Sequence, residues 1–260
     1  MTKRIIASLF ILTIFFFCCE KNEPISPPPT PMNLSIDVSN GSVNLSWDEV
    51  EEADGYKIFL SDSSGTDTVG NYLDMIGRLS PSYTDREPTK AGYYHVRTLI
   101  ETYYGDELSE PSNVVNTVPF TSPDSFQIYI WGTVGENSGF GWDSLGNGIV
   151  YHCEESTKDL VSMFIRDVFG GFYLFSADES PFEGNRSVTF IDIGEALLDT
   201  IRILPTSDSG YESTMKVYSG HIYGIYTDDK RYIKLEIVNV DHNSITFRYS
   251  FQKWQNLPVF

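Results

Sequence analysis

The sequence predicts an all-β protein whose folded part consists of two consecutive domains. Short segments in which apolar and polar residues alternate recur from residue 34 to the C-terminus, which is the pattern of strands with one buried face. Turn-forming pairs such as Asn40-Gly41 separate these segments. The roughly 230 residues that follow residue 30 are enough for two ordinary domains with sizeable cores.

The N-terminus has the pattern of a secretory signal peptide. Lys3 and Arg4 precede an apolar run at residues 5–17, which only Ser8 and Thr13 interrupt. This run is shorter than the ~20 residues that span a bilayer. The chain becomes polar directly after it, so we expect cleavage and export. The alternative is a signal-anchor helix.

The end of the apolar run resembles a bacterial lipobox, in which the cysteine behind the cleaved bond receives a diacylglycerol. Such signals prefer a small residue before that bond, so we predict residues 1–18 as the signal peptide and Cys19 as the lipidated residue. Phe17 departs from the pattern, and Cys18 is the alternative site. The resemblance implies a lipid anchor in the cell envelope, at the outer membrane, with the periplasmic and surface faces both open. Residues 19–30 are rich in proline and predict an extended spacer.

The charge of the chain excludes several partners. Removing the two cations of the signal peptide from a chain of net charge −18 leaves −20. So acidic a surface repels nucleic acid and anionic lipids, and we expect neither as a direct partner. Cys153 is the one cysteine beyond residue 19, so no intrachain disulfide is expected. We interpret it as a small buried residue in a strand.

The first domain is predicted at residues 31–119. Its expected strands follow one another at short intervals, at residues 34–38, 43–47, 56–60, from residue 92, and at residues 114–115. This domain resembles a fibronectin type III domain. The motifs that carry the resemblance are Pro31-x-Asn33-Leu34, Leu45-Ser46-Trp47, Ala53-Asp54-Gly55-Tyr56-Lys57-Ile58, Tyr94-His95-Val96-Arg97 and Ser109-Glu110-Pro111-Ser112-Asn113. The resemblance implies an immunoglobulin-like sandwich with Trp47 in its core and Tyr94 as the corner tyrosine. It implies no function, because this fold serves spacers and binding modules alike.

Residues 61–80 form a long segment for this family and carry Asp62, Asp67 and Asp74. These acids do not alternate as they do in a calcium-binding loop. We therefore interpret the segment as a solvated loop, with a calcium site as the alternative.

The second domain is predicted at residues 120–260 and ends in an antiparallel meander. Its expected strands are residues 221–226, 231–237 and 245–251, and the charged and apolar residues of 231–237 predict one solvent-exposed face. Earlier in this domain, residues 160–165 predict a buried strand before the Gly170-Gly171 turn. Residues 193–200 predict a short helix.

The end of the chain resembles a C-terminal module of exported lipoproteins of Bacteroidetes-type bacteria, which include haem-binding proteins of the HmuY type. The matching motifs are Gly220-His221-x-Tyr223, Tyr232-Ile233-Lys234 and Thr246-Phe247-Arg248-Tyr249-Ser250-Phe251-Gln252. If haem were bound, the resemblance would imply axial ligands, for which His152 and His221 are the candidates. The alternative is that both histidines are hydrogen-bonded residues of strands and that the protein holds no cofactor.

The tryptophans indicate glycan binding as an alternative function, because Trp131, Trp142 and Trp254 could stack on sugar rings. Trp142 beside Asp143, in the glycine-rich residues 139–148, is the most site-like of them; a structural turn is the alternative. The sequence has no Gly-x-Ser-x-Gly elbow, phosphate loop or His-Glu-x-x-His motif. We expect no catalytic residues and no metal ligands.

These patterns together predict a lipid-anchored, non-catalytic protein of the cell envelope. Its first domain would space or present a second domain that binds an extracellular protein or glycan. The candidate ligand-binding residues are Trp142, His152 and His221.

Overall fold

A computed structural model describes residues 26–65, 72–133 and 135–260. The predicted all-β fold is confirmed: the helical elements within this part of the chain are two short 3₁₀ turns, η1 (Glu155–Thr157) and η2 (Leu198–Thr200). Cys18, Cys19 and Asp67 lie outside the described residues. Within them, no helix is long and apolar enough to cross a membrane.

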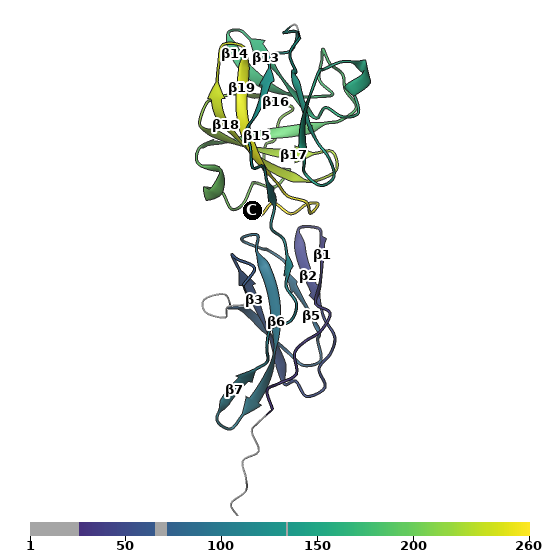
Figure 1. Ribbon diagram of the computed structural model, residues 1–260, viewed down its shortest axis with the longest axis vertical. Coiled ribbons are helices and arrows are strands. Elements are labelled where there is room, and N and C mark those ends of the chain that lie inside the picture. The colour runs from purple at the N-terminus through teal and green to yellow at the C-terminus, as the bar shows by residue number, and fades with distance from the viewer. Residues whose placement is uncertain (1–25, 66–71, 134) are drawn as a thin grey trace, which may run out of the picture.

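The first unit is a sandwich of two antiparallel sheets (Figure 1). One sheet has the order β1-β2-β5, and the other has the order β4-β3-β6-β7, with β8 also paired to β6. This arrangement is that of an immunoglobulin-like sandwich. The strands are β1 (Ser35–Ser39), β2 (Ser42–Ser46), β3 (Gly55–Ser61), β4 (Tyr72–Gly77), β5 (Ser82–Asp85), β6 (Tyr93–Thr102), β7 (Gly105–Leu108) and β8 (Val115–Asn116).

Its core contains the two aromatic residues that the fibronectin resemblance implies. Trp47 is 6% exposed and meets Tyr56 edge-on at 5.2 Å between ring centroids. Tyr94 is fully buried, and its hydroxyl lies 3.5 Å from the carboxylate of Asp85. A corner tyrosine bonds a backbone carbonyl instead, so the position of Tyr94 agrees with the resemblance but its hydrogen bond does not.

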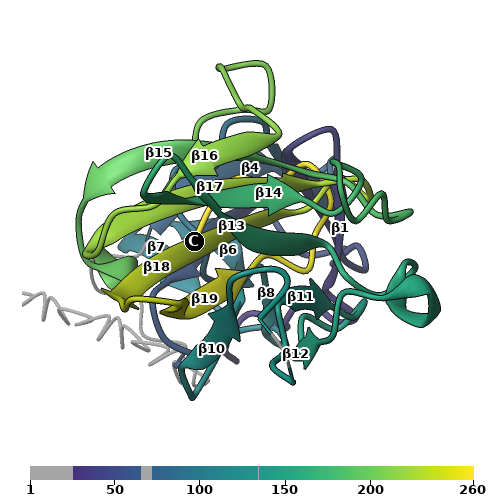
Figure 2. The ribbon, with the colours of Figure 1, turned by 90° about the horizontal axis from the view of Figure 1, so that it is seen from above.

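The second unit also has two sheets, of order β10-β19-β18-β17-β15 and β12-β11-β13-β14-β16, with β9 paired to β19. The strands of both lie around a common apolar core (Figure 2). The predicted meander is confirmed as β17, β18 and β19. The strands are β9 (Phe120–Thr121), β10 (Phe126–Tyr129), β11 (Gly139–Trp142), β12 (Gly148–Tyr151), β13 (Met163–Val168), β14 (Gly171–Ser176), β15 (Val188–Glu195), β16 (Thr214–Lys216), β17 (His221–Thr227), β18 (Tyr232–Val240) and β19 (Ser244–Phe251).

Two expectations for this unit are wrong. The helix predicted at residues 193–200 is the end of β15 followed by the single turn η2, because β15 continues to pair with β17 past a register shift at Asp192/Gly194. The exposed face predicted for β18 is buried: Lys234 is 4% and Glu236 8% exposed. The Lys234 ammonium donates to the carbonyl of Leu198, the first residue of η2, and to the carbonyl of Ile201, which follows η2, at 2.7 Å each.

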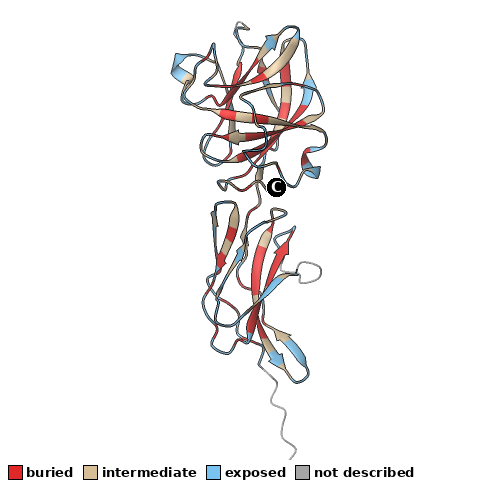
Figure 3. Ribbon diagram, turned by 180° about the vertical axis from the view of Figure 1, so that it is seen from behind, coloured by how far each residue is buried: buried red, intermediate tan, exposed pale blue. Residues whose placement is uncertain are grey.

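The two units stack end to end into a rod (Figure 1). The C-terminal segment packs at the joint, where Leu257 and Val259 belong to the apolar cluster of the first sandwich. The first described residues leave the sandwich at its other end, beside the β6–β7 hairpin, and Thr98 donates there to the carbonyl of Pro29 at 2.6 Å (Figure 1). The turn end of that hairpin, residues 101–106, is largely exposed, whereas buried residues run along β3 and the first part of β6 (Figure 3).

Candidate ligand-binding site

The largest cavity that we delineate in the described residues has a volume of about 500 Å³ and lies in the second unit. This volume is within the range of small-molecule sites, ~300–1,000 Å³. Trp142, at the end of β11, and Tyr151, at the end of β12, line one part of it. Gly141 lets β11 pack closely against the backbone of Leu160, since a Cβ at Gly141 would lie 1.9 Å from the carbonyl oxygen of Leu160.

Asp143 closes the glycine-rich turn at the cavity. Its carboxylate accepts the backbone N–H groups of Leu145 and Asn147 at 2.9 Å each and the Asn147 side-chain amide at 2.8 Å. The Asn147 side-chain bond, with help from the backbone bonds, lowers the pKa of Asp143. The turn needs glycine at Gly146, where φ is +92°. Asp143 is therefore a fixed, ionised part of the cavity wall.

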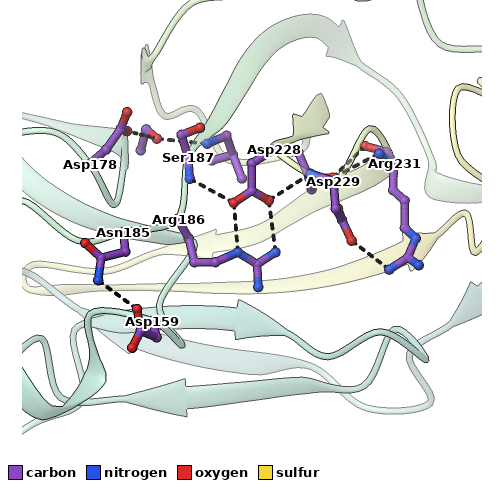
Figure 4. Close-up of polar contacts among 11 residues, drawn as sticks. Asp159, Asp178, Asn185, Arg186, Ser187, Asp228, Asp229 and Arg231 are labelled. Carbon is purple, nitrogen blue, oxygen red and sulfur yellow. Dashed lines mark hydrogen bonds and ion pairs between the residues drawn. The ribbon is translucent and has the colours of Figure 1, made fainter.

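A second wall is built by an arginine and an aspartate that are distant in the sequence (Figure 4). Arg186 donates to Asp228 through Nε at 3.0 Å and through Nη2 at 3.1 Å, which is a bidentate pair. Asp228 also accepts the backbone N–H of Asp229 at 2.9 Å. No sequence motif marks these residues, and only the pairing of β15 with β17 brings residues 186 and 228 together.

Two more carboxylates of the wall have partners of their own (Figure 4). Asp229 accepts Arg231 Nη1 at 2.8 Å, and Asp159 accepts the Asn185 side-chain amide at 2.7 Å. The cavity is consequently rich in carboxylate oxygens that the fold already holds in place.

Trp142 is a core residue at the edge of this cavity. It is 5% exposed and lies edge-on to Phe140 and Tyr249, with ring centroids 5.0 and 5.8 Å away. The ring thus has no free face on which a sugar could stack. Its Nε1–H is buried and has no hydrogen-bond partner among the described residues.

His152 lies elsewhere, just after β12, and is exposed. It lines a separate cavity of about 280 Å³ with Trp131 and Cys153. Burial raises the pKa of the Cys153 thiol to about 11, so the thiol stays protonated and unreactive at neutral pH. Trp131 is 36% exposed and is more accessible than Trp142.

His221 is the first residue of β17 and is oriented by a carboxylate. Its Nδ1 lies 3.0 and 3.1 Å from the two oxygens of Asp192, and its ring packs beside Tyr218 and Tyr223. Within the described residues, no cavity that we delineate is lined by two of the three predicted residues Trp142, His152 and His221. The described residues also hold no group of three or more His, Cys, Asp or Glu side chains arranged for a metal ion.

The chain matches no known protein-family profile and no curated protein. It is similar to the solved structure of a DUF4466 family protein from Parabacteroides merdae, with 8% identity, 90% of this chain and 96% of that one covered, and a TM-score of 0.42. An FN3 domain of human collagen XX is 20% identical, covering 35% of this chain and 98% of the domain, with a TM-score of 0.26. A structure of titin kinase and its flanking domains is 12% identical over 86% of this chain, with a TM-score of 0.25, and the chain spans 38% of its length.

Proposed function

We propose that the chain is an exported, non-catalytic protein of the cell envelope, anchored by a lipid on Cys19. The first sandwich acts as a spacer and presents the second unit, which binds an extracellular ligand. The observation that carries this proposal is the position of the chain start: the first described residues lie at the end of the rod opposite the second unit (Figure 1). A lipid on Cys19 would lie within ~25 Å of that end, because seven residues separate Cys19 from Ser26.

The joint between the units supports a presenting role. Apolar side chains of the C-terminal segment are buried against the first sandwich, and buried Gln252 bridges the two units by hydrogen bonds. A spacer that holds its partner domain in a fixed direction keeps the binding surface away from the membrane.

The state of the carboxylates supports a binding role over hydrolysis. Glycoside hydrolysis needs one carboxyl group of raised pKa as the acid and a second one free to act as base or nucleophile. In the cavity Asp143 has a lowered pKa, and Asp228 and Asp229 are each paired with an arginine. Asp143 is therefore unsuited to act as a proton donor at neutral pH, and the carboxylates of Asp228 and Asp229 are engaged by arginines.

Metabolic labelling with palmitate tests the anchor. We expect label on the wild type and on Cys18→Ala, none on Cys19→Ala, and membrane association that is lost only in the last. Label that persists in Cys19→Ala and disappears in Cys18→Ala moves the anchor by one residue. Label on none of the three proteins refutes the lipid anchor.

A further inference from the structure

We propose that the turn of the β6–β7 hairpin, which carries Tyr103 and Tyr104, lies in the headgroup layer of a zwitterionic phospholipid bilayer. This contact is additional to the lipid on Cys19 and orients the rod relative to the membrane. The inference rests on the proposed anchor, because the anchor brings this end of the molecule to the bilayer. An anchor alone does not predict the contact.

The two tyrosines of this aromatic tip are almost wholly exposed. Tyr103 is 96% and Tyr104 is 91% exposed, and their rings meet edge-on with centroids 5.3 Å apart. They form a two-residue turn, since Thr102 pairs with Gly105. Such turns favour glycine, asparagine and aspartate, and the turn between β1 and β2 of the same sandwich is Asn40-Gly41. The two tyrosines therefore serve neither the turn nor the core.

Hydrogen bonds hold the aromatic tip in one shape. The hydroxyl of Thr102 donates to the carbonyl of Gly105 at 2.7 Å and accepts the backbone N–H of Tyr104 at 3.3 Å. Gly105 has a φ of +126°, which favours glycine. The backbone of the turn is thus ordered before it meets a surface, so binding costs little further ordering.

The start of the described chain lies beside this hairpin. Thr98 of β6 donates to the carbonyl of Pro29 at 2.6 Å, and the first described residues leave the sandwich at this end (Figure 1). Ten residues lead from Cys19 to Pro29 and span at most ~35 Å. This length is an upper limit, so a lipid on Cys19 allows the tip to reach the same bilayer.

Further exposed apolar side chains gather at this end of the sandwich. β4 and β6 both run antiparallel to β3, so the loops that follow them leave at the same end. The loop after β4 carries Leu79, which is 86% exposed. Met32, which is 60% exposed, lies near that loop. Its carbonyl accepts the N–H of Asp48, and the N–H of the neighbouring Trp47 donates to Pro81 of the loop.

The chemistry of the tip fits a membrane interface. Tyrosine is enriched there because its ring is apolar while its hydroxyl stays in contact with water. Glu101, Asp106 and Glu107 flank the tip, and one of them, Asp106, is paired with Lys57 at 3.0 Å. The remaining negative charge repels anionic headgroups, so the surface suits a zwitterionic lipid.

The test reconstitutes the lipidated protein into phosphatidylcholine vesicles with and without brominated acyl chains, which quench tryptophan fluorescence on contact. Tyr103→Trp places a fluorophore at the tip. Phe169→Trp is the matched control, because it replaces an exposed aromatic residue at the β13–β14 turn of the second unit. Emission is measured as the difference from the wild type, which has four tryptophans of its own.

We expect brominated phosphatidylcholine to reduce the difference emission of Tyr103→Trp about twofold and to leave Phe169→Trp unchanged. Brominated phosphatidylglycerol should quench Tyr103→Trp less. Emission of Tyr103→Trp that is equal in both phosphatidylcholines, quenching at both positions, or stronger quenching by the anionic lipid overturns the inference. Thermal unfolding establishes that the variants are folded, and Tyr104→Trp replaces Tyr103→Trp if the latter is not.

Failure of the anchor gives a different result from failure of the contact. Palmitate label together with an unquenched tip leaves the anchor intact and overturns the contact. If no label is found, a hexahistidine tag in place of residues 1–19 tethers the same variants to nickel-chelating lipids in phosphatidylcholine. Quenching at position 103 then supports the contact without the lipid on Cys19, and its absence overturns the contact.

Discussion

The side-chain amide of Gln252 donates a hydrogen bond to the carbonyl oxygen of Thr117 at 3.1 Å, and this bond joins the second unit to the first. The same nitrogen donates to the carbonyl of Val259 at 2.7 Å. Gln252 is fully buried, so its amide satisfies two acceptors that water does not reach. The side chain of Gln252, which directly follows the last strand, thus joins the end of the first unit to the C-terminal segment.

Replacing this residue should loosen the joint. We expect Gln252→Leu to lower the free energy of unfolding by about 1–3 kcal/mol, because two buried carbonyls lose their donor. Urea denaturation measures the loss. Gln255→Leu removes an exposed amide that donates to Asp229 and should cost well under half as much. Equal losses in the two variants would contradict a special role for the joint.

The buried Lys234 should make stability depend on pH. Burial lowers its pKa to about 8, from an ordinary value of 10.5, although Asp199 acts in the opposite direction. Between these values the unfolded chain binds more protons than the folded chain, so stability rises with pH across that window. Relative to Lys234→Met, the wild type should gain roughly 2 kcal/mol between pH 7.5 and 9.5. Urea denaturation at each pH measures this difference, and a difference that stays constant or falls would refute it.

The tryptophans should differ in their contribution to stability. Trp142→Ala removes a ring enclosed by core aromatic residues and should cost about 3–5 kcal/mol. Trp131→Ala removes a ring that is 36% exposed and should cost about 1–2 kcal/mol. Chemical denaturation followed by circular dichroism measures both losses. A larger loss at Trp131 than at Trp142 would show that the core is assigned wrongly.

Haem should not bind through the two histidines. Within the described residues, His152 lines a cavity that His221 does not reach, and the two histidines line no common cavity that we delineate. Titration with haem should therefore give no shifted Soret band. A band that appears with the wild type and disappears in His152→Ala or His221→Ala would contradict this.

Much of the fold follows from local patterns. Alternation placed β2, β3 and β19 within about two residues of their ends, because a strand with one buried face leaves a period of two in the sequence. The same reasoning failed at β18, whose period of two is real but whose charged face is covered by η2. It also failed at residues 193–200, where pairing with β17 outweighs helix-forming residues.

The candidate site was predicted only in part. Trp142 and Asp143 were singled out because a tryptophan beside an acid in a glycine-rich turn is visible locally. The Arg186–Asp228 pair leaves no such signal, since its partners are 42 residues apart and each is an ordinary charged residue. The burial of the Trp142 ring likewise depends on Tyr249, which comes from a distant strand.

The sequence by itself determined the all-β class and the buried residues of strands such as β2, β3 and β19, because these depend on periodicity and turn chemistry over a few residues. Tertiary structure alone decided which aspartates are paired, which tryptophan is exposed and where the first described residues lie relative to the cavity. The physical reason is that burial, charge pairing and direction arise from contacts between strands far apart in the chain. Such contacts form only when the sheets pack.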